Sequence, residues 1–531
     1  MISFLKKYQD HFGLLILWLL IILIINPIGD FPLNDDWCYG KSVKTLLEDG
    51  YLKLYNWGEM TLVGHVYWGY FFTKIFGFSF TVLRWSTLVM AFGTLIGIYE
   101  LCKLANISRW VTLVSVLLCM MNPIFLSLSF SFMTDVPFYF VTIWAFYFFA
   151  KALQTDTWKP IIWGIFFCYW AFTIRQLAWV FPIVYLITML LAKKRTRSNF
   201  IKAITPLLAL LVFSMVFSYI METNDLLQDR YNSKFNLMID NILHLDKVII
   251  INSISYFCRS MSYLGFLLLP IHLIYFSRYK FKGYKILAII WTVLVATFLL
   301  KLGKQIPSLD NIWIDFGVGP TTLAHHAGNF TTSPDPRAPK LFWQIITIIG
   351  VFSSVTLVFH SKRLAVAVFK KTTVYPLVVL AFVFSVVYLT PFLIVGVYDR
   401  YLLPLFPISI ILLGTNASVK VPKKIYQYIA YGCIGLFTLF SVCAVHDHLS
   451  WNRVRWKAIQ EALDSGIPKN HINGGVEYVT WNFFSEDKEK WWESVKPVYF
   501  LVFKPADNQK VIKEYTYERW LPGDGVLFFV E

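Results

Sequence analysis

Charged residues are scarce in this chain of 531 residues, of which only 15% are charged, 57% are hydrophobic and 18% are aromatic. Soluble domains carry about 25% charged residues, so the composition excludes a soluble protein with a large core. Many stretches approach 20 consecutive apolar residues, which is about the length that crosses a hydrocarbon layer roughly 30 Å thick. The sequence therefore predicts an all-α polytopic membrane protein.

Cysteine pairs and signature motifs are also lacking. The seven cysteines are widely spaced and lie nearly all in apolar segments, which excludes a disulfide framework and a metal knuckle. No GxSxG, HExxH or Walker motif occurs, and Gly317-Val318-Gly319-Pro320 has the composition of a turn rather than a phosphate loop. The sequence contains no diagnostic ligand set for a metal, so the cofactor is unknown and a divalent metal is left open.

The net charge of +16 does not indicate a nucleic-acid partner, because the excess is confined to one part of the chain. Residues 447–531 contain 11 Lys and Arg against 13 Asp and Glu, so the positive excess belongs to the apolar part. Short basic loops between spans set the orientation of a membrane protein. The charge therefore predicts topology and no nucleic-acid binding.

Thirteen transmembrane segments are predicted, the first of them a retained anchor rather than a signal peptide. They lie at about 12–28, 80–102, 110–130, 136–153, 160–174, 177–192, 201–220, 252–276, 285–302, 341–360, 373–396, 401–416 and 425–445. Alternate loops are basic, which places them in the cytoplasm by the positive-inside rule. The N-terminus is then cytoplasmic and the C-terminus extracytoplasmic. The long loops 29–79, 221–251 and 303–340 face outward with it.

Two domains follow from this pattern. Residues 1–446 are predicted to form the transmembrane domain, with short helices at 36–47 and 62–76 lying along the membrane within the external loop 29–79. Residues 447–531 have the composition of a small extracytoplasmic α/β domain. It would begin with an amphipathic helix over 451–463, followed by strands at 475–481, 497–503 and 526–530.

Two adjacent carboxylates, Asp35 and Asp36, occur in the first external loop. They could be a solvated pair or cap the helix that follows, but a carboxylate beside the membrane also suits a general base for a hydroxyl acceptor. Asp135 stands before a proline at the outer end of a span, which is a typical helix start. Its predicted depth is that of Asp35, so the two could share a cavity.

Basic and aromatic candidates lie on the same predicted face. Arg175 fits either a side chain that reaches the membrane surface or a contact with phosphate. Asp399 and Arg400 could pair with each other, or Arg400 could neutralise an anionic lipid head group. His65 and the pair His325-His326 could be metal ligands, but a hydrogen-bonded interfacial histidine is favoured because no partner stands at a diagnostic spacing.

Several of these residues match motifs of a known family. Asp35-Asp36-Trp37-Cys38-Tyr39 resembles an Asp-Glu-x-x-Tyr motif, and Arg400, Tyr401, Pro404 and Pro407 match an Arg-Tyr-x-x-Pro-x-x-Pro pattern. With Asp135, they make the chain similar to the GT-C glycosyltransferases of the protein O-mannosyltransferase and lipid A aminoarabinose transferase superfamily. One departure is that Tyr67-Trp68 lacks the preceding Glu-Lys-Pro of the aminoarabinose enzymes, whose glutamate is metal-associated and whose lysine binds phosphate.

The resemblance implies an enzyme in the plasma membrane, such as a bacterial inner membrane, that moves a sugar from a polyprenyl phosphate. The acceptor would be a hydroxyl of a glycolipid, a glycan or a protein on the extracytoplasmic face, and transfer would invert the anomeric carbon. Asp35 would be the base, with Asp36 and Asp135 beside it, and Tyr39 belongs to the same motif. Arg175 and Arg400 would bind the phosphate, and Asp399, Tyr39 and His65 are further candidates for binding the substrate. The alternatives are a transporter or flippase, and a lipid-dependent oligosaccharide ligase or polymerase.

Overall fold

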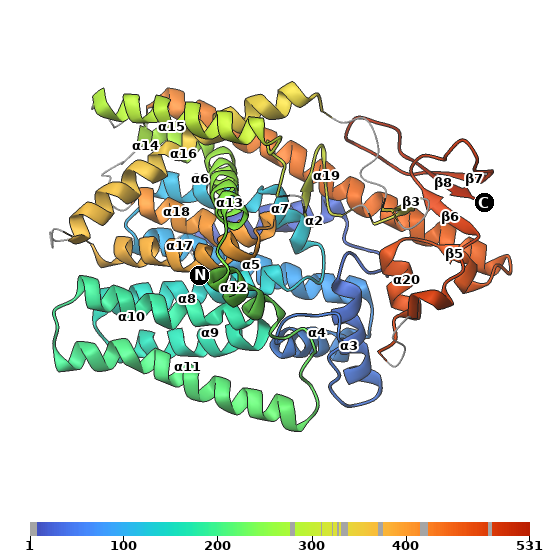
Figure 1. The fold of residues 1–531 in the computed structure, drawn as a ribbon, viewed down its shortest axis with the longest axis horizontal. Coiled ribbons are helices and arrows are strands. Elements are labelled where there is room, and N and C mark those ends of the chain that lie inside the picture. The colour runs from blue at the N-terminus through green and yellow to red at the C-terminus, as the bar shows by residue number, and fades with distance from the viewer. Residues whose placement is uncertain are drawn as a thin grey trace.

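The computed structural model describes residues 8–276, 282–309, 311–320, 322–325, 329–330, 338–369, 375–414, 423–486 and 491–531. Helices dominate, and a small sheet follows near the C-terminus (Figure 1). This arrangement confirms the predicted fold class.

Each predicted transmembrane segment coincides with a helix or a bent helix pair. Among the described residues, seven helices are long and apolar enough to cross a membrane, or nine if each of two bent pairs counts as one span. The bent pairs turn by 61° and 85°. The helices of this region are α2 (Gln9–Ile25), α5 (Phe80–Leu104), α6 (Arg109–Met120), α7 (Pro123–Ser129), α8 (Asp135–Thr155), α9 (Trp158–Ile174), α10 (Val180–Ala192), α11 (Arg197–Thr223), α13 (Lys247–Leu267), α14 (Leu269–Phe276), α15 (Lys282–Lys301), α16 (Lys340–Phe369), α17 (Pro376–Val395), α18 (Leu405–Gly414) and α19 (Lys424–Asp464).

The bend between α6 and α7 has a local cause. Asn122 caps α7 by accepting hydrogen bonds from the backbone N–H of Ile124 and Phe125, at 2.9 and 3.4 Å, and Pro123 occupies the first turn. Proline has no N–H to continue the preceding helix, so a new helix starts here in another direction. The chain then reaches Phe132 and the start of α8 within a few residues, beside the first loop.

The first loop contains the two predicted helices, α3 (Asp36–Glu48) and α4 (Val63–Phe76). Helix α4 packs against α3, α5 and α9. The loop 221–251 adds a helix that was not predicted, α12 (Ser233–Leu243), which is amphipathic and packs on α17. Short 3-10 helices η1 (Gln176–Trp179) and η3 (Asp399–Leu402) precede α10 and α18.

The C-terminal part is built on α19, which continues without a break from the last apolar segment through the predicted amphipathic helix. A four-stranded sheet follows in the order β5 (Ile472–Asn473), β6 (Tyr499–Val502), β8 (Val526–Val530), β7 (Val511–Thr516). Strand β5 pairs in parallel with β6, and the other pairs are antiparallel. The remaining elements are β1 (Trp313–Ile314), β2 (Gly317–Val318), β3 (Ala324–His325), β4 (Asn329–Phe330), η4 (Lys469–His471) and η5 (Trp491–Ser494).

The strand predicted over 475–481 is wrong, because this segment forms helix α20 (Val476–Phe483). Seven residues that alternate apolar and polar do not separate a strand from a short helix. Tertiary contacts decide here: Tyr478 is buried in a core with Ile459 and Leu501, and Glu477 is buried against Arg455. In Figure 1, α3, α4, α20 and strands β5 to β8 gather on the right, so the first loop and the C-terminal part occupy the same end of the molecule.

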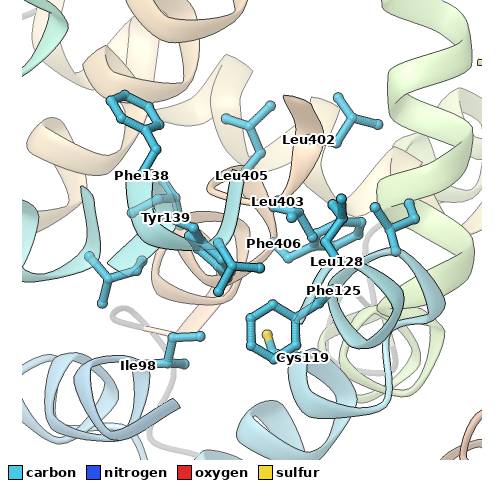
Figure 2. Close-up of a cluster of buried hydrophobic side chains, with 14 of the residues drawn as sticks. Ile98, Cys119, Phe125, Leu128, Phe138, Tyr139, Leu402, Leu403, Leu405 and Phe406 are labelled. Carbon is cyan, nitrogen blue, oxygen red and sulfur yellow. The ribbon is translucent and has the colours of Figure 1, made fainter. Parts of the chain in front are cut away.

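A cluster of buried apolar side chains (Figure 2) includes residues that closely follow Asp135 and Arg400 in the sequence. Phe138 and Tyr139 come from the first turns of α8, and Leu402, Leu403 and Phe406 come from η3 and the start of α18. All five side chains are at most 2% exposed. Close packing leaves little freedom to such side chains, so this cluster fixes the helix ends that carry Asp135 and Arg400.

Candidate active site

Asp36 holds the turn that precedes α3. Its Oδ1 accepts the backbone N–H of Leu33 at 2.5 Å, and its Oδ2 accepts the backbone N–H of Phe132 at 3.0 Å. The side chain is fully buried, and burial raises its pKa to about 7 although Arg84 opposes this rise. Both carboxylate oxygens are therefore engaged by backbone, and Asp36 fastens the first loop to the segment before α8.

Asp35 stands at the N-cap position of α3, yet its side chain makes no capping hydrogen bond. Instead Oδ1 accepts the indole N–H of Trp57 at 2.9 Å, and the described residues place no hydrogen-bond donor on Oδ2. Burial raises the pKa of Asp35, while the positive charge of Arg400 and the bond from Trp57 lower it. A carboxylate with one oxygen fixed and a raised proton affinity suits a proton acceptor.

Asp135, the first residue of α8, gathers two arginines that are far apart in the sequence. Its Oδ1 is 2.9 Å from Arg175 Nη2 and its Oδ2 is 3.7 Å from Arg400 Nη1. Neither approach has hydrogen-bond geometry, so both are ion pairs without aligned donors. Arg175 also donates from Nη2 to Thr134 Oγ1 at 2.6 Å. The structure thus brings Asp135, Arg175 and Arg400 together, as a shared site requires.

Arg400, in η3, retains unused donors. Its side chain is 9% exposed, and neither Nε nor Nη1 has a hydrogen-bond partner among the described residues. Burial disfavours the charge of Arg400, but Asp135, Tyr401 and Asp35 raise its pKa above the ordinary range. A buried, permanently charged fork with free N–H groups is suited to bind a phosphate.

Asp399 turns away from this fork. Its Oδ2 accepts the backbone N–H of Ile312 and Trp313 at 3.0 and 2.7 Å, and its Oδ1 accepts the N–H of Arg400 at 2.7 Å. Burial raises its pKa to about 7 against these bonds. No ion pair joins Asp399 to the Arg400 guanidinium in the described part of the chain. Asp399 therefore fixes the loop 303–340 onto η3, and it leaves Arg400 free to face Asp135.

Tyr39 and His65 pack edge to face, with ring centroids 5.7 Å apart. His65 Nε2 is 3.0 Å from the carbonyl oxygen of Phe132 and must carry the proton, because only an N–H donates to a carbonyl. Its ring stacks on Phe132 at 4.0 Å, and burial lowers its pKa to about 4. His65 is a buried hydrogen-bonded histidine. It binds the carbonyl oxygen of Phe132, while Asp36 binds the backbone N–H of the same residue. The Asp35 and Arg400 charges both act on the Tyr39 hydroxyl, whose pKa burial raises.

Two arginines that were not identified from the sequence fasten the start of the first loop. Arg84, fully buried in α5, donates from Nη1 to the carbonyl oxygens of Pro27 and Gly29, at 3.1 and 2.5 Å. Arg453 donates from Nε to the carbonyl of Ile28 at 2.9 Å. A charge inside a predicted span marks a functional position by default, so Arg84 was detectable, whereas Arg453 lies in a segment where charges are common.

No metal centre emerges from these contacts. Within the described ranges, no three His, Cys, Asp or Glu side chains come together in a group that could hold an ion. The side chains of His325 and His326 lie outside the described residues. The polar groups at this end are instead two arginines joined by one carboxylate, with a second carboxylate beside them.

Comparisons with known proteins bear on this site. Residues 64–220 match the family of dolichyl-phosphate-mannose-protein mannosyltransferases. No curated protein matches the chain. Among solved structures, the crystal structure of ArnT from Cupriavidus metallidurans in the apo state matches 84% of this chain and 80% of its own, with 12% identity and a TM-score of 0.33. A likeness this low carries no argument about the fold or the chemistry.

The apolar helices and the polar cluster at one end define a multi-pass membrane protein. The family match confirms the predicted resemblance to the protein O-mannosyltransferase superfamily and supports a membrane glycosyltransferase of the GT-C type. The matched segment contains His65, Asp135 and Arg175, and it lies between Asp35 and Arg400 in the sequence.

Proposed function

We propose that this protein transfers a sugar from a polyprenyl-phosphate-linked donor to an acceptor hydroxyl on the extracytoplasmic face of the membrane, with inversion at the anomeric carbon. The observation that carries the proposal is the pairing of Arg400 and Arg175 with Asp135 while Arg400 keeps free donors next to the charge of Asp35. Transfer of a sugar from a phosphate leaving group needs a base for the acceptor hydroxyl and a cationic group that binds the phosphate, both at one site.

In this mechanism, an acceptor hydroxyl gives its proton to Asp35 Oδ2 as its oxygen attacks the anomeric carbon. The bond from that carbon to the phosphate oxygen breaks on the opposite side, and its electron pair leaves with the polyprenyl phosphate. Negative charge then grows on the phosphate, where Arg400 and Arg175 stabilise it. Displacement from the opposite side inverts the configuration of the carbon.

The remaining residues position these groups. Asp135 holds both arginines at one depth, and Asp36 and Asp399 hold the two loops through backbone N–H groups. The charges of Asp35 and Arg400 both act on Tyr39, and in this mechanism its hydroxyl contacts the transferred sugar or the acceptor. His65 shapes the wall of the site through Phe132.

A lipid-linked donor and an outward-facing site fit the distribution of charge. Residues 1–446 contain 37 of the 48 Lys and Arg residues, and 22 of these 37 lie in the N-terminal segment and the alternate loops that the positive-inside rule assigns to the cytoplasm. The end with Asp35 then faces outward from the plasma membrane, and a bacterial inner membrane is the location that the family suggests. A donor with a polyprenyl tail would reach Arg400 from the bilayer. The acceptor would be a glycolipid, a glycan or a protein.

A panel of synthetic donors tests the proposal. The full-length protein in detergent, with a membrane extract as the source of acceptors, is given polyprenyl phosphates that carry mannose, glucose, galactose, N-acetylglucosamine or aminoarabinose. Release of polyprenyl phosphate together with labelled sugar in the acceptor fraction is the expected result for at least one donor. Translocation of intact donor across vesicles without cleavage would instead identify a flippase and contradict transfer.

A further inference from the structure

Glu477, in α20 of the C-terminal part, reaches the first loop at the residue next to Asp35. Its Oε1 accepts the backbone N–H of Asn34 at 3.0 Å. Its Oε2 accepts from Arg455 Nη2 at 2.8 Å and from the hydroxyl of Thr322. With only 2% of Glu477 exposed, a single carboxylate joins three segments that are distant in the sequence.

Within the C-terminal part, Glu477 is held by Arg455, which is itself fixed by further hydrogen bonds. Arg455 is fully buried in α19 and donates from Nε to the carbonyl of Gly474 at 2.5 Å and from Nη1 to Asn452 Oδ1 at 3.2 Å. Gly475 makes this approach possible, because a Cβ there would lie 2.4 Å from Arg455 Nη2. A carboxylate paired in this way is held in a single position.

On the side of the first loop, the same carboxylate binds the turn that Asp36 holds through Leu33. Asn34 has a left-handed backbone, with φ of 58°, and stands between Leu33, which Asp36 binds, and Asp35. A hydrogen bond to the Asn34 amide therefore restrains the peptide that leads directly into Asp35. Asn34 directly precedes Asp35 in the sequence. Loss of the hydrogen bond from the Asn34 amide to Glu477 is therefore expected to let the Asp35 carboxylate change its orientation.

We propose that Glu477 is a positioning residue, which holds Asp35 in its productive orientation through the Asn34 amide and thereby makes activity depend on docking of the C-terminal part. The inference rests on the proposed function of Asp35. The charge of Glu477 acts in addition to its hydrogen bond. The groups that face Asp35 include Arg400, Glu477, Asp135, Tyr39, Cys38 and the Trp57 indole, and among them Glu477 and Asp135 raise the pKa of Asp35. Those that face Glu477 include Arg455, His448 and Asp36.

Glu477→Gln isolates this effect, since an amide has one oxygen where the carboxylate has two. Arg455 and Thr322 offer two donors to one oxygen, and Asn34 offers one to the other. The amide oxygen is expected to turn toward Arg455, which leaves the amide NH₂ against the Asn34 N–H. The matched control is Glu461→Gln, which removes the same charge from the exposed pair with Lys513 at 2.7 Å.

The experiment compares the full-length variants with the donor found by the panel, and measures hydrogen exchange of the peptide that contains Asn34 and Asp35. Glu477→Gln is expected to exchange faster there and to lose kcat about 10- to 100-fold, as a misplacement of about 1 Å does, with the donor KM unchanged. Since the charge of Glu477 raises the pKa of Asp35, its loss moves the acidic limb of the kcat profile to lower pH. Glu461→Gln should match the wild type throughout.

Unchanged exchange, or a kcat and pH profile like those of Glu461→Gln, would overturn the inference. If Glu477→Gln does not fold, the double variant Arg455→Met/Glu477→Leu removes both charges and leaves no unpaired ion; it is expected to show the same loss of kcat and faster exchange. Asp35→Asn is measured in parallel. Its full activity would refute the proposed function, whereas inactivity of Asp35→Asn beside a fully active Glu477→Gln refutes only the positioning role.

Discussion

Asp135 pairs with Arg175 at 2.9 Å and with Arg400 at 3.7 Å, and at the same time two of the Arg400 nitrogens stay without a hydrogen-bond partner among the described residues. One carboxylate thus offsets two guanidinium charges, which leaves the group of Asp135, Arg175 and Arg400 with a net positive charge. A site that is positive before an anion arrives can bind a phosphate without moving its own charges.

Asp135→Asn should destabilise the protein, because it leaves two buried guanidinium groups without their counter-charge. Removing one partner of a buried ion pair costs about 3–5 kcal/mol. We expect a large fall in the thermal unfolding midpoint in detergent. Asp49→Asn, which changes an exposed carboxylate of the first loop, serves as the control. Equal midpoints for the two variants would show that the two ion pairs contribute nothing to stability.

Arg400→Lys keeps the charge but removes the planar fork. A single ammonium cannot reach both Asp135 and a phosphate in the fork geometry, so we expect kcat/KM to fall about 100-fold, the lower end for loss of a donor that stabilises developing charge. Arg109→Lys changes an exposed arginine that pairs with Asp10 at 2.6 Å, and it should be neutral. An Arg400→Lys enzyme with wild-type kcat/KM would remove Arg400 from the phosphate site.

His65 predicts a pH dependence of stability. Burial lowers its pKa from 6.5 to about 4 in the folded state. The folded protein therefore binds this proton less tightly than the unfolded chain, so the stabilising contribution is complete above about pH 6.5 and is lost as the pH falls toward 4. His65→Gln, whose amide can also donate to Phe132, does not titrate. We expect the unfolding midpoint of the wild type to fall more steeply over this range than that of His65→Gln.

The control for this titration is His244→Gln, at the exposed residue that follows α12. Its unfolding midpoint should follow the wild-type curve over the whole pH range. Parallel curves for His65→Gln and the wild type would mean that the folded state accepts a charged His65.

Gly319 lies in close contact with His448. Comparing alanine substitutions at Gly319 and at Gly303 separates the effect of this contact from the effect of backbone strain. Gly319 and Gly303 both have a left-handed φ, of 79° and 64°, but a Cβ at Gly319 would lie 2.3–2.6 Å from His448 ring atoms, whereas a Cβ at Gly303 meets nothing within 4 Å. Gly303→Ala should cost about 1 kcal/mol of strain. Gly319→Ala should lower the unfolding midpoint clearly more, and an equal shift would show that His448 gives way freely.

Apolar length and basic loops were sufficient to predict the helices of the membrane region. A chain in a bilayer must satisfy its backbone polar groups internally, so a long apolar run has few alternatives to a helix. The loop helices α3 and α4 also followed from pattern. The segment 475–481 did not, because its fold depends on the partners of Tyr478 and Glu477, which lie elsewhere in the sequence.

For the site, the sequence supplied the candidates but not their partners. Asp35 and Asp36 are neighbours with the same chemistry, and only the structure separates the one held by Trp57 from the one bound by two backbone amides. Asp399 was a candidate partner of Arg400, yet its side chain binds backbone N–H groups of the loop 303–340 instead. Glu477 could not be identified, because a charged residue in a polar segment is marked only by its burial.

The most direct test of the account is the turnover of Asp35→Asn beside Asp49→Asn, in folded full-length protein with a donor that the wild type consumes. Asp35→Asn should lose kcat at least about 100-fold, within the range that a general base contributes, while Asp49→Asn keeps it. In the wild type, kcat should fall as acid protonates Asp35, at a pH above the ordinary aspartate pKa of 3.8 because burial raises it. Undiminished turnover by a folded Asp35→Asn protein would contradict the assignment of Asp35 as the base.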